Sequence, residues 1–313
     1  MVDQQLVKKL TSYTNPVLNE LAIICGCPVL STTKANRISG ILAGYNFYLK
    51  NYHEKQPRKT LSIDIGIRNF SYCKTIASPN TFPLTVTKWD KFDLFDRYGA
   101  GYEYLLHESS VVDERYQLNY IVNQLMNELK PSDFDVVVLE TQRTRSVSNS
   151  ATLPNVLKNF TLENLIIGHT YPQIVIPMSS SSMLNFWIGR YIQSSKTKKS
   201  KSPKRVRFDL IKSWRGKMFE LPGYPSGELK KKEFMEYLNL KERNKIDDLV
   251  DSLLYNLTIN SYFNNLKEFH ELVQYDDCDL IEFVNSKRAI QLEFIEPLIE
   301  KYELEIKDSW MKS

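Results

Sequence analysis

Residues 59–66 read Lys-Thr-Leu-Ser-Ile-Asp-Ile-Gly. Apolar residues alternate with polar ones along this stretch, which predicts a β-strand, and Gly66 ends the strand. Asp64 stands inside the apolar run, two residues before that glycine. An aspartate close to a strand end is most often a turn residue, so Asp64 needs support from other parts of the chain before it indicates chemistry.

Strand-like composition recurs in four further segments, at 70–77, 84–89, 135–140 and 173–178. The short connections between the first three strands predict an antiparallel meander. The run at 135–140 is apolar and β-branched without alternation, as expected of a strand buried on both faces. Amphipathic helices are predicted on either side of it, over 113–129 and 153–168. Strands separated by helices indicate parallel crossovers, so the sequence predicts a mixed five-stranded α/β sheet flanked by helices.

Helices are predicted before and after this sheet. Asn15-Pro16 and Ser31-Thr32-Thr33 are helix starts, each followed by apolar residues at helical spacing. Later helices are predicted over 228–240 and 244–260. We therefore expect three parts: a small helical module over 1–55, an α/β domain over 59–260 and a helical C-terminal extension over 261–313.

The composition is that of a globular protein. Of the 313 residues 42% are hydrophobic and 25% are charged, enough for a sizeable core. No run approaches 18 apolar residues, so no membrane-spanning helix is expected. The four cysteines are sparse and unevenly placed, which disfavours a disulfide framework and indicates a reducing compartment. Walker A and dinucleotide fingerprints are missing from the sequence, so no nucleotide cofactor is expected.

Charge is distributed unevenly along the chain, whose formal net charge is +4. Residues 268–313 contain 12 acids and 5 bases, so the rest of the chain is strongly basic. Ten Lys or Arg residues stand in 196–217 against the single Asp209, and a basic loop is predicted over 194–207. A strongly basic region of this kind favours binding to a polyanion, usually nucleic acid. For this run taken alone, a solvated charged loop is an equal alternative.

Carboxylates occur at three places where a buried core disfavours them, and Asp64 is the first. Glu140 ends the most hydrophobic strand, and Asp247, Asp248 and Asp251 begin a later helix, with Asp251 one turn from the other two. Taken alone, Glu140 is explained as a solvent-exposed residue at a strand end, and the aspartates are explained by a favourable interaction with the helix dipole. The first and fourth strands are expected to be adjacent and parallel, however, which places Asp64 beside Glu140.

A group of carboxylates repels itself unless a cation lies among its members. Hard oxygen ligands select Mg²⁺, with Mn²⁺ as a substitute. Two such ions, about 3.5–4 Å apart, activate a water and stabilise the leaving oxygen in phosphodiester cleavage. The acids therefore indicate a metal-dependent nuclease with two ions in its active site.

Three blocks carry these acids: Ser62–Phe70 (SIDIGIRNF), Leu139–Ser146 (LETQRTRS) and Lys245–Ser252 (KIDDLVDS). In this order they resemble the fungal mitochondrial Holliday-junction resolvases, ribonuclease-H-like relatives of bacterial RuvC. Gly26–Ala35 (GCPVLSTTKA) is similar to the SAP-type DNA-binding motif that precedes the nuclease in this family, with Thr32 in place of the usual glycine.

The resemblance implies a Mg²⁺-dependent homodimer that binds four-way DNA junctions in mitochondria and nicks two opposed strands. It implies metal ligands at Asp64, Glu140, Asp247 and Asp251, and Asp248 as a ligand or an orienting acid. RuvC-type helices suggest the pair Asp248 and Asp251, whereas the fungal block suggests Asp247 and Asp251. We favour the second pairing. Mitochondrial localisation rests on the resemblance alone, since the N-terminal residues are not rich in arginine.

Basic residues near these blocks are predicted to bind DNA. Arg143 and Arg145 closely follow Glu140, and the planar guanidinium pairs with phosphate in a bidentate manner; surface ion pairs are the alternative. Lys34 and Arg37 of the SAP-like segment are expected to contact backbone phosphates. A second phosphate track is expected at Lys230 and Lys231, where a solvated helix face is an equally good interpretation.

Symmetric cleavage requires two active sites at a fixed spacing, and the sequence contains one set of acids. The functional unit is therefore expected to be a two-fold homodimer. The helix at 153–168 is more apolar than a single buried stripe requires, so the predicted interface consists of Leu153, Val156, Leu157 and Phe160. The alternative is a helix buried within its own domain. The alternative function is a junction-binding or nucleoid-binding protein that has the same fold but does not cut.

Overall fold

The computed structural model describes residues 4–78, 81–142, 154–192, 203–223, 232, 235–236, 246–274 and 279–306. The chain folds into two compact units. One consists of Arg58–Met183 and Ile211–Asn256, and the other of Met1–Pro57, Leu184–Leu210 and Leu257–Ser313. Among the described residues, no helix is long and apolar enough to cross a membrane.

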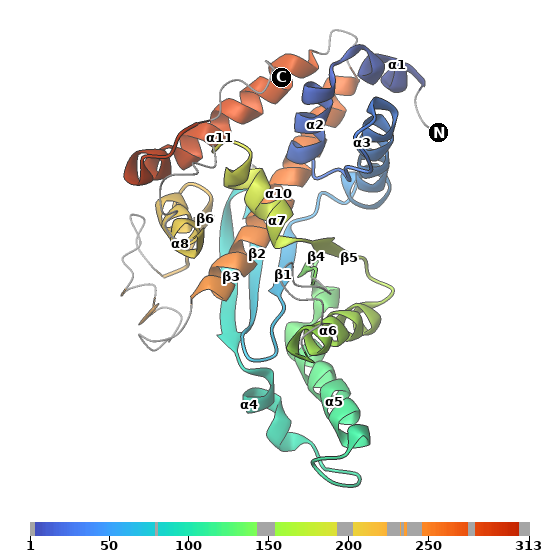
Figure 1. Cartoon of the computed structure of the whole chain (residues 1–313), viewed down its shortest axis with the longest axis vertical. Coiled ribbons are helices and arrows are strands. Elements are labelled where there is room, and N and C mark those ends of the chain that lie inside the picture. Colours follow the sequence, from blue (N-terminus) through green and yellow to red (C-terminus); the bar gives the residue numbers. More distant parts are fainter. Residues whose placement is uncertain are drawn as a thin grey trace. The chain divides into compact units, whose positions relative to one another are not determined.

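The first unit contains a six-stranded sheet with the order β5-β4-β1-β2-β3-β6 (Figure 1). Its strands are β1 (Lys59–Asp64), β2 (Phe70–Ser78), β3 (Thr81–Phe92), β4 (Val136–Glu140), β5 (Val175–Met178) and β6 (Phe219–Glu220). β1, β2 and β3 form the predicted antiparallel meander, while β4 pairs parallel with β1 and with β5. The mixed sheet is confirmed, but β6 was not predicted, because two residues are too few to show a periodicity.

Two helices cover one face of this sheet. They are α5 (Val111–Leu129) and α6 (Pro154–Thr170), at the places where the sequence predicts amphipathic helices. Their buried residues, among them Ile121, Leu125, Leu162 and Ile166, pack on apolar side chains of β1, β2 and β4 to form the core of this unit. A short helix, α4 (Leu94–Tyr98), follows β3.

The first ten residues of a longer helix, α10, lie on the opposite face of the sheet. α10 (Asp247–Val273) is 27 residues long, longer than the predicted 244–260. Its first ten residues belong to the sheet-containing unit and contact the sheet through polar side chains. Asn256 is fully buried and donates to the carbonyl oxygens of Thr60 and Cys73, and the Thr75 hydroxyl donates to it at 2.7 Å. Hydrogen bonds therefore fix the position of α10 along the sheet.

The second unit is helical. It contains α1 (Gln4–Ser12), α2 (Asn15–Ile24), α3 (Lys34–Tyr48), most of α8 (Pro203–Trp214), α11 (Leu280–Tyr302) and the rest of α10, and α7 (Ser180–Leu184) ends at its border. Both predicted helix starts are confirmed: Pro16 is in the first turn of α2, and Thr33 caps α3 by accepting from Asn36 N. α8 already begins at Pro203, so the basic loop predicted over 194–207 extends too far.

The N-terminal helices share their core with the C-terminal part of the chain. Asn265 donates to the Ile24 carbonyl at 2.7 Å, and α2 packs on α11. Gly26 has φ +63° and lies so close to the Tyr262 ring that a Cβ atom would be 2.3 Å from it. This grouping differs from the predicted division into 1–55, 59–260 and 261–313, because short amphipathic helices need partners to bury their apolar faces, and those partners are distant in sequence.

Candidate active site

Asp64 and Glu140 lie side by side at the ends of two neighbouring strands. β1 and β4 run parallel with Ile63 opposite Leu139, so the next residue on each strand is an acid. Asp64 is only 7% exposed, and its carboxyl group is within hydrogen-bonding reach of Glu140. The sequence predicted this adjacency from the crossover connection.

The pKa of Asp64 is raised well above its ordinary value. Burial is the largest cause, because a medium of low dielectric constant disfavours the charged carboxylate. The hydrogen bond and the charge of Glu140 come next, followed by the charges of Asp251 and Asp248. The structure therefore brings together acids from all three sequence blocks, as the interpretation of the acids requires.

The start of α10 is tied to the meander, which places its aspartates. The Ser71 hydroxyl donates to the Asp248 carbonyl at 2.6 Å, and the Trp89 indole donates to the Leu249 carbonyl at 2.9 Å. Asp248 also forms an ion pair with Lys91 of β3. Asp247, the first residue of the helix, is partly exposed.

Sequence reasoning assigned no role to three residues around the acids. Gln142 donates to the Glu140 carboxylate at 2.8 Å, and its own backbone N–H donates to buried Glu163 of α6 at 3.0 Å. Tyr255 is fully buried one turn beyond Asp251, and its pKa is raised by burial and then by the charges of Glu140, Asp64 and Asp251. The quoted block 139–146 already contained Gln142, and Tyr255 follows Asp251 at helical spacing, so both positions had a signal in the sequence.

Hard oxygen donors of this kind fit a divalent cation. Among the residues that the structure describes, no three His, Cys, Asp or Glu side chains already enclose an ion position. Asp64 and Glu140 instead contact each other directly, and after burial the charge of Glu140 is among the causes that raise the pKa of Asp64, so the two groups repel each other when both are charged. A cation between them would remove that repulsion, so the donor set fits Mg²⁺ or Mn²⁺.

The predicted DNA-binding residues divide into two groups. Arg143, Arg145, Lys230 and Lys231 lie outside the described residues. The Lys34 ammonium donates to the Thr11 carbonyl at 2.5 Å, and Arg37 donates to the carbonyls of Thr32 and Asn15 at 3.1 and 3.4 Å. Lys34 and Arg37 therefore join helices of their own unit, and their contact with phosphate stays a prediction.

The predicted dimer helix has an exposed apolar side. Leu157 and Phe160 are 53% and 39% exposed, whereas Leu162 and Ile166 are fully buried in the core. Val156 is partly exposed and Leu153 lies outside the described residues. The alternative that the whole helix is buried within its own domain is therefore wrong for Leu157 and Phe160.

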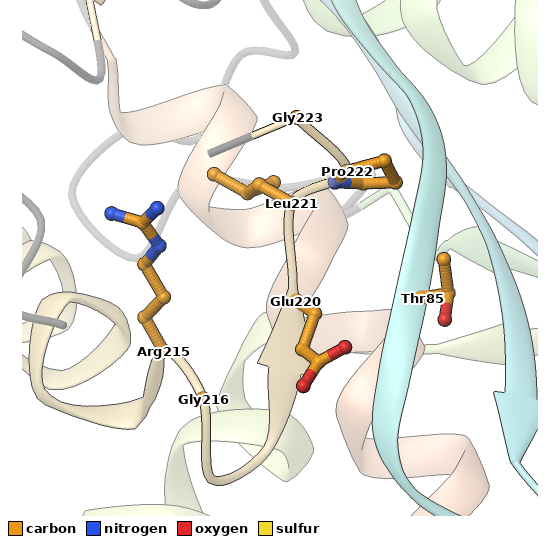
Figure 2. Close-up of a pocket in the computed structure, with 7 residues that line it drawn as sticks. All are labelled: Thr85, Arg215, Gly216, Glu220, Leu221, Pro222 and Gly223. Atoms are coloured by element: carbon orange, nitrogen blue, oxygen red, sulfur yellow. The ribbon is translucent and has the colours of Figure 1, made fainter. Parts of the chain in front are cut away.

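A surface pocket of about 350 Å³ lies elsewhere in the same unit, between β3 and the turn after β6 (Figure 2). It is lined by Thr85, Arg215, Gly216, Glu220, Leu221, Pro222 and Gly223. None of the acids discussed above lines it, so it is separate from the candidate active site.

Known proteins with the same features identify the family. The family described as "Mitochondrial resolvase Ydc2 / RNA splicing MRS1" matches residues 60–269, well over half of the chain. The cruciform cutting endonuclease 1, mitochondrial, of Saccharomyces cerevisiae is 24% identical over 323 residues, which cover 88% of this chain and 86% of that protein. The crystal structure of the yeast mitochondrial Holliday junction resolvase Ydc2 matches with a TM-score of 0.53 and 17% identity, over 82% of this chain and 97% of that one. The sheet order and this match show a ribonuclease-H-like fold, and the chain belongs to the family of the mitochondrial resolvase Ydc2 and the RNA-splicing protein MRS1.

Proposed function

We propose that this protein is a metal-dependent endonuclease that resolves four-way DNA junctions by nicking two opposed strands, in the recombination of mitochondrial DNA. The observation that carries the proposal is the convergence of Asp64, Glu140 and Asp251 at one end of the sheet, with Asp248 close by. Both relatives named above are mitochondrial proteins that act on branched DNA, which supports the substrate and the location.

The same acids argue against a role that requires binding alone. A protein that only binds DNA or RNA gains affinity from positive charge, and buried carboxylates repel the phosphates. They also destabilise the metal-free protein, since the raised pKa of Asp64 means that the folded state disfavours its charged form at neutral pH. We therefore favour catalysis over binding alone, whether of nucleoid DNA or of RNA in splicing.

We assign Asp64, Glu140 and Asp251 as metal ligands, with a fourth carboxylate from Asp247 or Asp248. Two bound Mg²⁺ ions, or Mn²⁺ in their place, would supply the activated water and the positive charge that phosphodiester cleavage needs. Gln142 orients the Glu140 carboxylate through its 2.8 Å hydrogen bond.

The nuclease is proposed to act as a homodimer in which α6 faces its symmetry mate. The exposed apolar side of α6 around Leu157 and Phe160 supports this assignment, because large apolar side chains gathered on a surface mark an interaction site. Arg143 and Arg145 are proposed to bind phosphates near the cut, and Lys230 and Lys231 to bind them farther away. Lys34 and Arg37 are proposed to add phosphate contacts from the N-terminal helices.

The test is nicking of an end-labelled four-way junction, with and without Mg²⁺, by wild type and by Asp64→Asn. Loss of a ligand removes several kcal/mol of charge stabilisation, so Asp64→Asn should nick roughly 100-fold more slowly or worse. Junction affinity measured without metal should be unchanged or tighter, because one negative charge is gone.

Asp135→Asn is the matched control. Asp135 stands at the other end of the same two strands, where its carboxylate accepts from the backbone N–H groups of Arg58 and Lys59 at 2.8 Å. This variant should nick like wild type. Cleavage by Asp64→Asn within tenfold of the control would contradict the assignment of the site.

A further inference from the structure

A row of polar side chains crosses the sheet at the candidate active site. Asp64 of β1 pairs with Ser71 of β2, and Ser71 pairs with Lys91 of β3. Directly paired residues of antiparallel strands project from the same face of a sheet, and Glu140 continues the row on β4. Lys91 therefore lies in the row of the acids, two strand spacings of about 4.8 Å each from Asp64.

The side chain of Lys91 is largely shielded from solvent and is held by an acid of α10. Its side chain is 8% exposed, and its ammonium forms an ion pair with the Asp248 carboxylate, whose side chain is 29% exposed. Placing a charge out of contact with water is costly unless the charge is paired and hydrogen-bonded. An apolar residue in this place would carry no such cost, so the ion pair with Asp248 is what compensates for the burial of the Lys91 ammonium.

The ion pair acts on the first turn of α10. Asp248 is fixed at two points, by Lys91 through its carboxylate and by the Ser71 hydroxyl through its carbonyl at 2.6 Å. Asp251 is three residues farther along the same helix, so the position of this first turn sets the position of Asp251 relative to Asp64 and Glu140.

We propose that Lys91 is a positioning residue of the nuclease: it keeps the Asp248 carboxylate on the β3 side of the site, out of the metal-ligand set, and offsets part of the negative charge of the acids. This inference rests on the proposed function. It decides the fourth ligand in favour of Asp247, since Asp248 is engaged by Lys91. It also gives Asp248 the orienting role that the sequence left open.

Lys91→Met removes the charge and keeps most of the length of the side chain. The released Asp248 carboxylate makes the acids more negative, so Mg²⁺ should bind the DNA-free protein roughly tenfold more tightly, as measured by titration calorimetry. The maximal nicking rate at saturating Mg²⁺ should nevertheless fall about tenfold or more, because Asp248 then enters the ligand set and Asp251 loses its fixed place. A loss of structure alone weakens metal binding and nicking together, so the opposite changes identify a positioning role.

Three further variants complete the experiment. Lys91→Arg should restore the wild-type rate and Mg²⁺ affinity, since it retains the charge. Asp248→Asn added to Lys91→Met should return Mg²⁺ affinity to the wild-type value. Lys88→Met is the matched control, because Lys88 projects from the other face of β3, is 46% exposed and pairs with Glu128 at 3.1 Å. It should change neither quantity.

Unchanged Mg²⁺ affinity and unchanged rate in Lys91→Met would overturn the inference, as would weaker Mg²⁺ binding in that variant. The proposed function fails separately, if wild type does not nick junctions with Mg²⁺. In that case the calorimetry of the DNA-free variants still decides whether Lys91 controls the charge and position of Asp248.

Discussion

Replacing Asn256 with alanine should destabilise the protein and displace the helix that carries Asp251. Asn256 is a fully buried residue of α10 and forms hydrogen bonds with four groups of β1 and β2. Its amide nitrogen lies 3.3 Å from the Thr60 carbonyl and 3.2 Å from both the Ser62 hydroxyl and the Cys73 carbonyl. Its amide oxygen accepts from the Thr75 hydroxyl at 2.7 Å. Asn256→Ala removes every one of these bonds.

The magnitude follows from the groups left without a partner. The Thr75 hydroxyl is fully buried, and a buried polar group that loses its hydrogen bond costs about 1–3 kcal/mol. The deleted amide also leaves a small cavity, which adds roughly 1 kcal/mol. We expect a total near 3 kcal/mol, which lowers the melting temperature by about 6–12 °C in a domain of this size.

The assay is thermal unfolding without metal, followed by junction nicking at a temperature where the variant is folded. Asn264→Ala is the matched control, because Asn264 is on the same helix, only partly buried, and bonds to Glu268 one turn away at 2.7 Å. Such a surface pair contributes about 0.5 kcal/mol. If Asn256→Ala melts within 2 °C of the control, or nicks at the wild-type rate, the buried amide does not hold α10 in place.

Two further predictions concern charge and assembly. The pKa of Asp64 is raised in the folded state, so the stability it contributes is present below its unfolded pKa and is lost as the pH rises through its folded pKa. The metal-free protein should therefore melt at a higher temperature at mildly acidic than at neutral pH. Asp64→Asn should reduce this difference in melting temperature, and an unchanged difference would contradict the reasoning. Leu157 and Phe160 are exposed on the single chain. Replacing both with glutamate should give a folded protein that sediments as a monomer and nicks junctions one strand at a time. A variant that still sediments as a dimer would place the interface elsewhere.

The sequence predicted the part of the site that depends on local pattern and topology. Alternation identified β1, the β-branched run identified β4, and the intervening helix implied that the two strands are parallel. Asp64 and Glu140 were then expected to lie side by side, and they do. The helix that became α10 was recognised by its apolar spacing, and the charges of its residues Asp251 and Asp248 contribute to the raised pKa of Asp64.

The division of the chain depended on contacts that no local pattern encodes. Periodicity shows that α2 has an apolar face, but not that α10 and α11 cover it. One such contact joins Gly26 to Tyr262, more than two hundred residues apart. Lys91 was missed for a related reason: a lysine near the end of a strand reads as solvent-exposed, and only the register of β2 and β3 turns it toward the acids.

The two faces of the sheet explain why the acids meet in one arrangement. The face toward α5 and α6 is apolar, and apolar attraction is non-directional, so it stabilises neighbouring positions of a helix almost equally. The face toward α10 instead buries Thr60, Ser62 and Thr75 opposite Ser252 and Asn256, and Ser62 donates to the Ser252 carbonyl at 2.7 Å. A slip of α10 by one turn would move Asp251 about 5.4 Å along the sheet and would leave these buried groups without partners. The polar face therefore restricts α10 to one position, and that position brings Asp251 to Asp64 and Glu140.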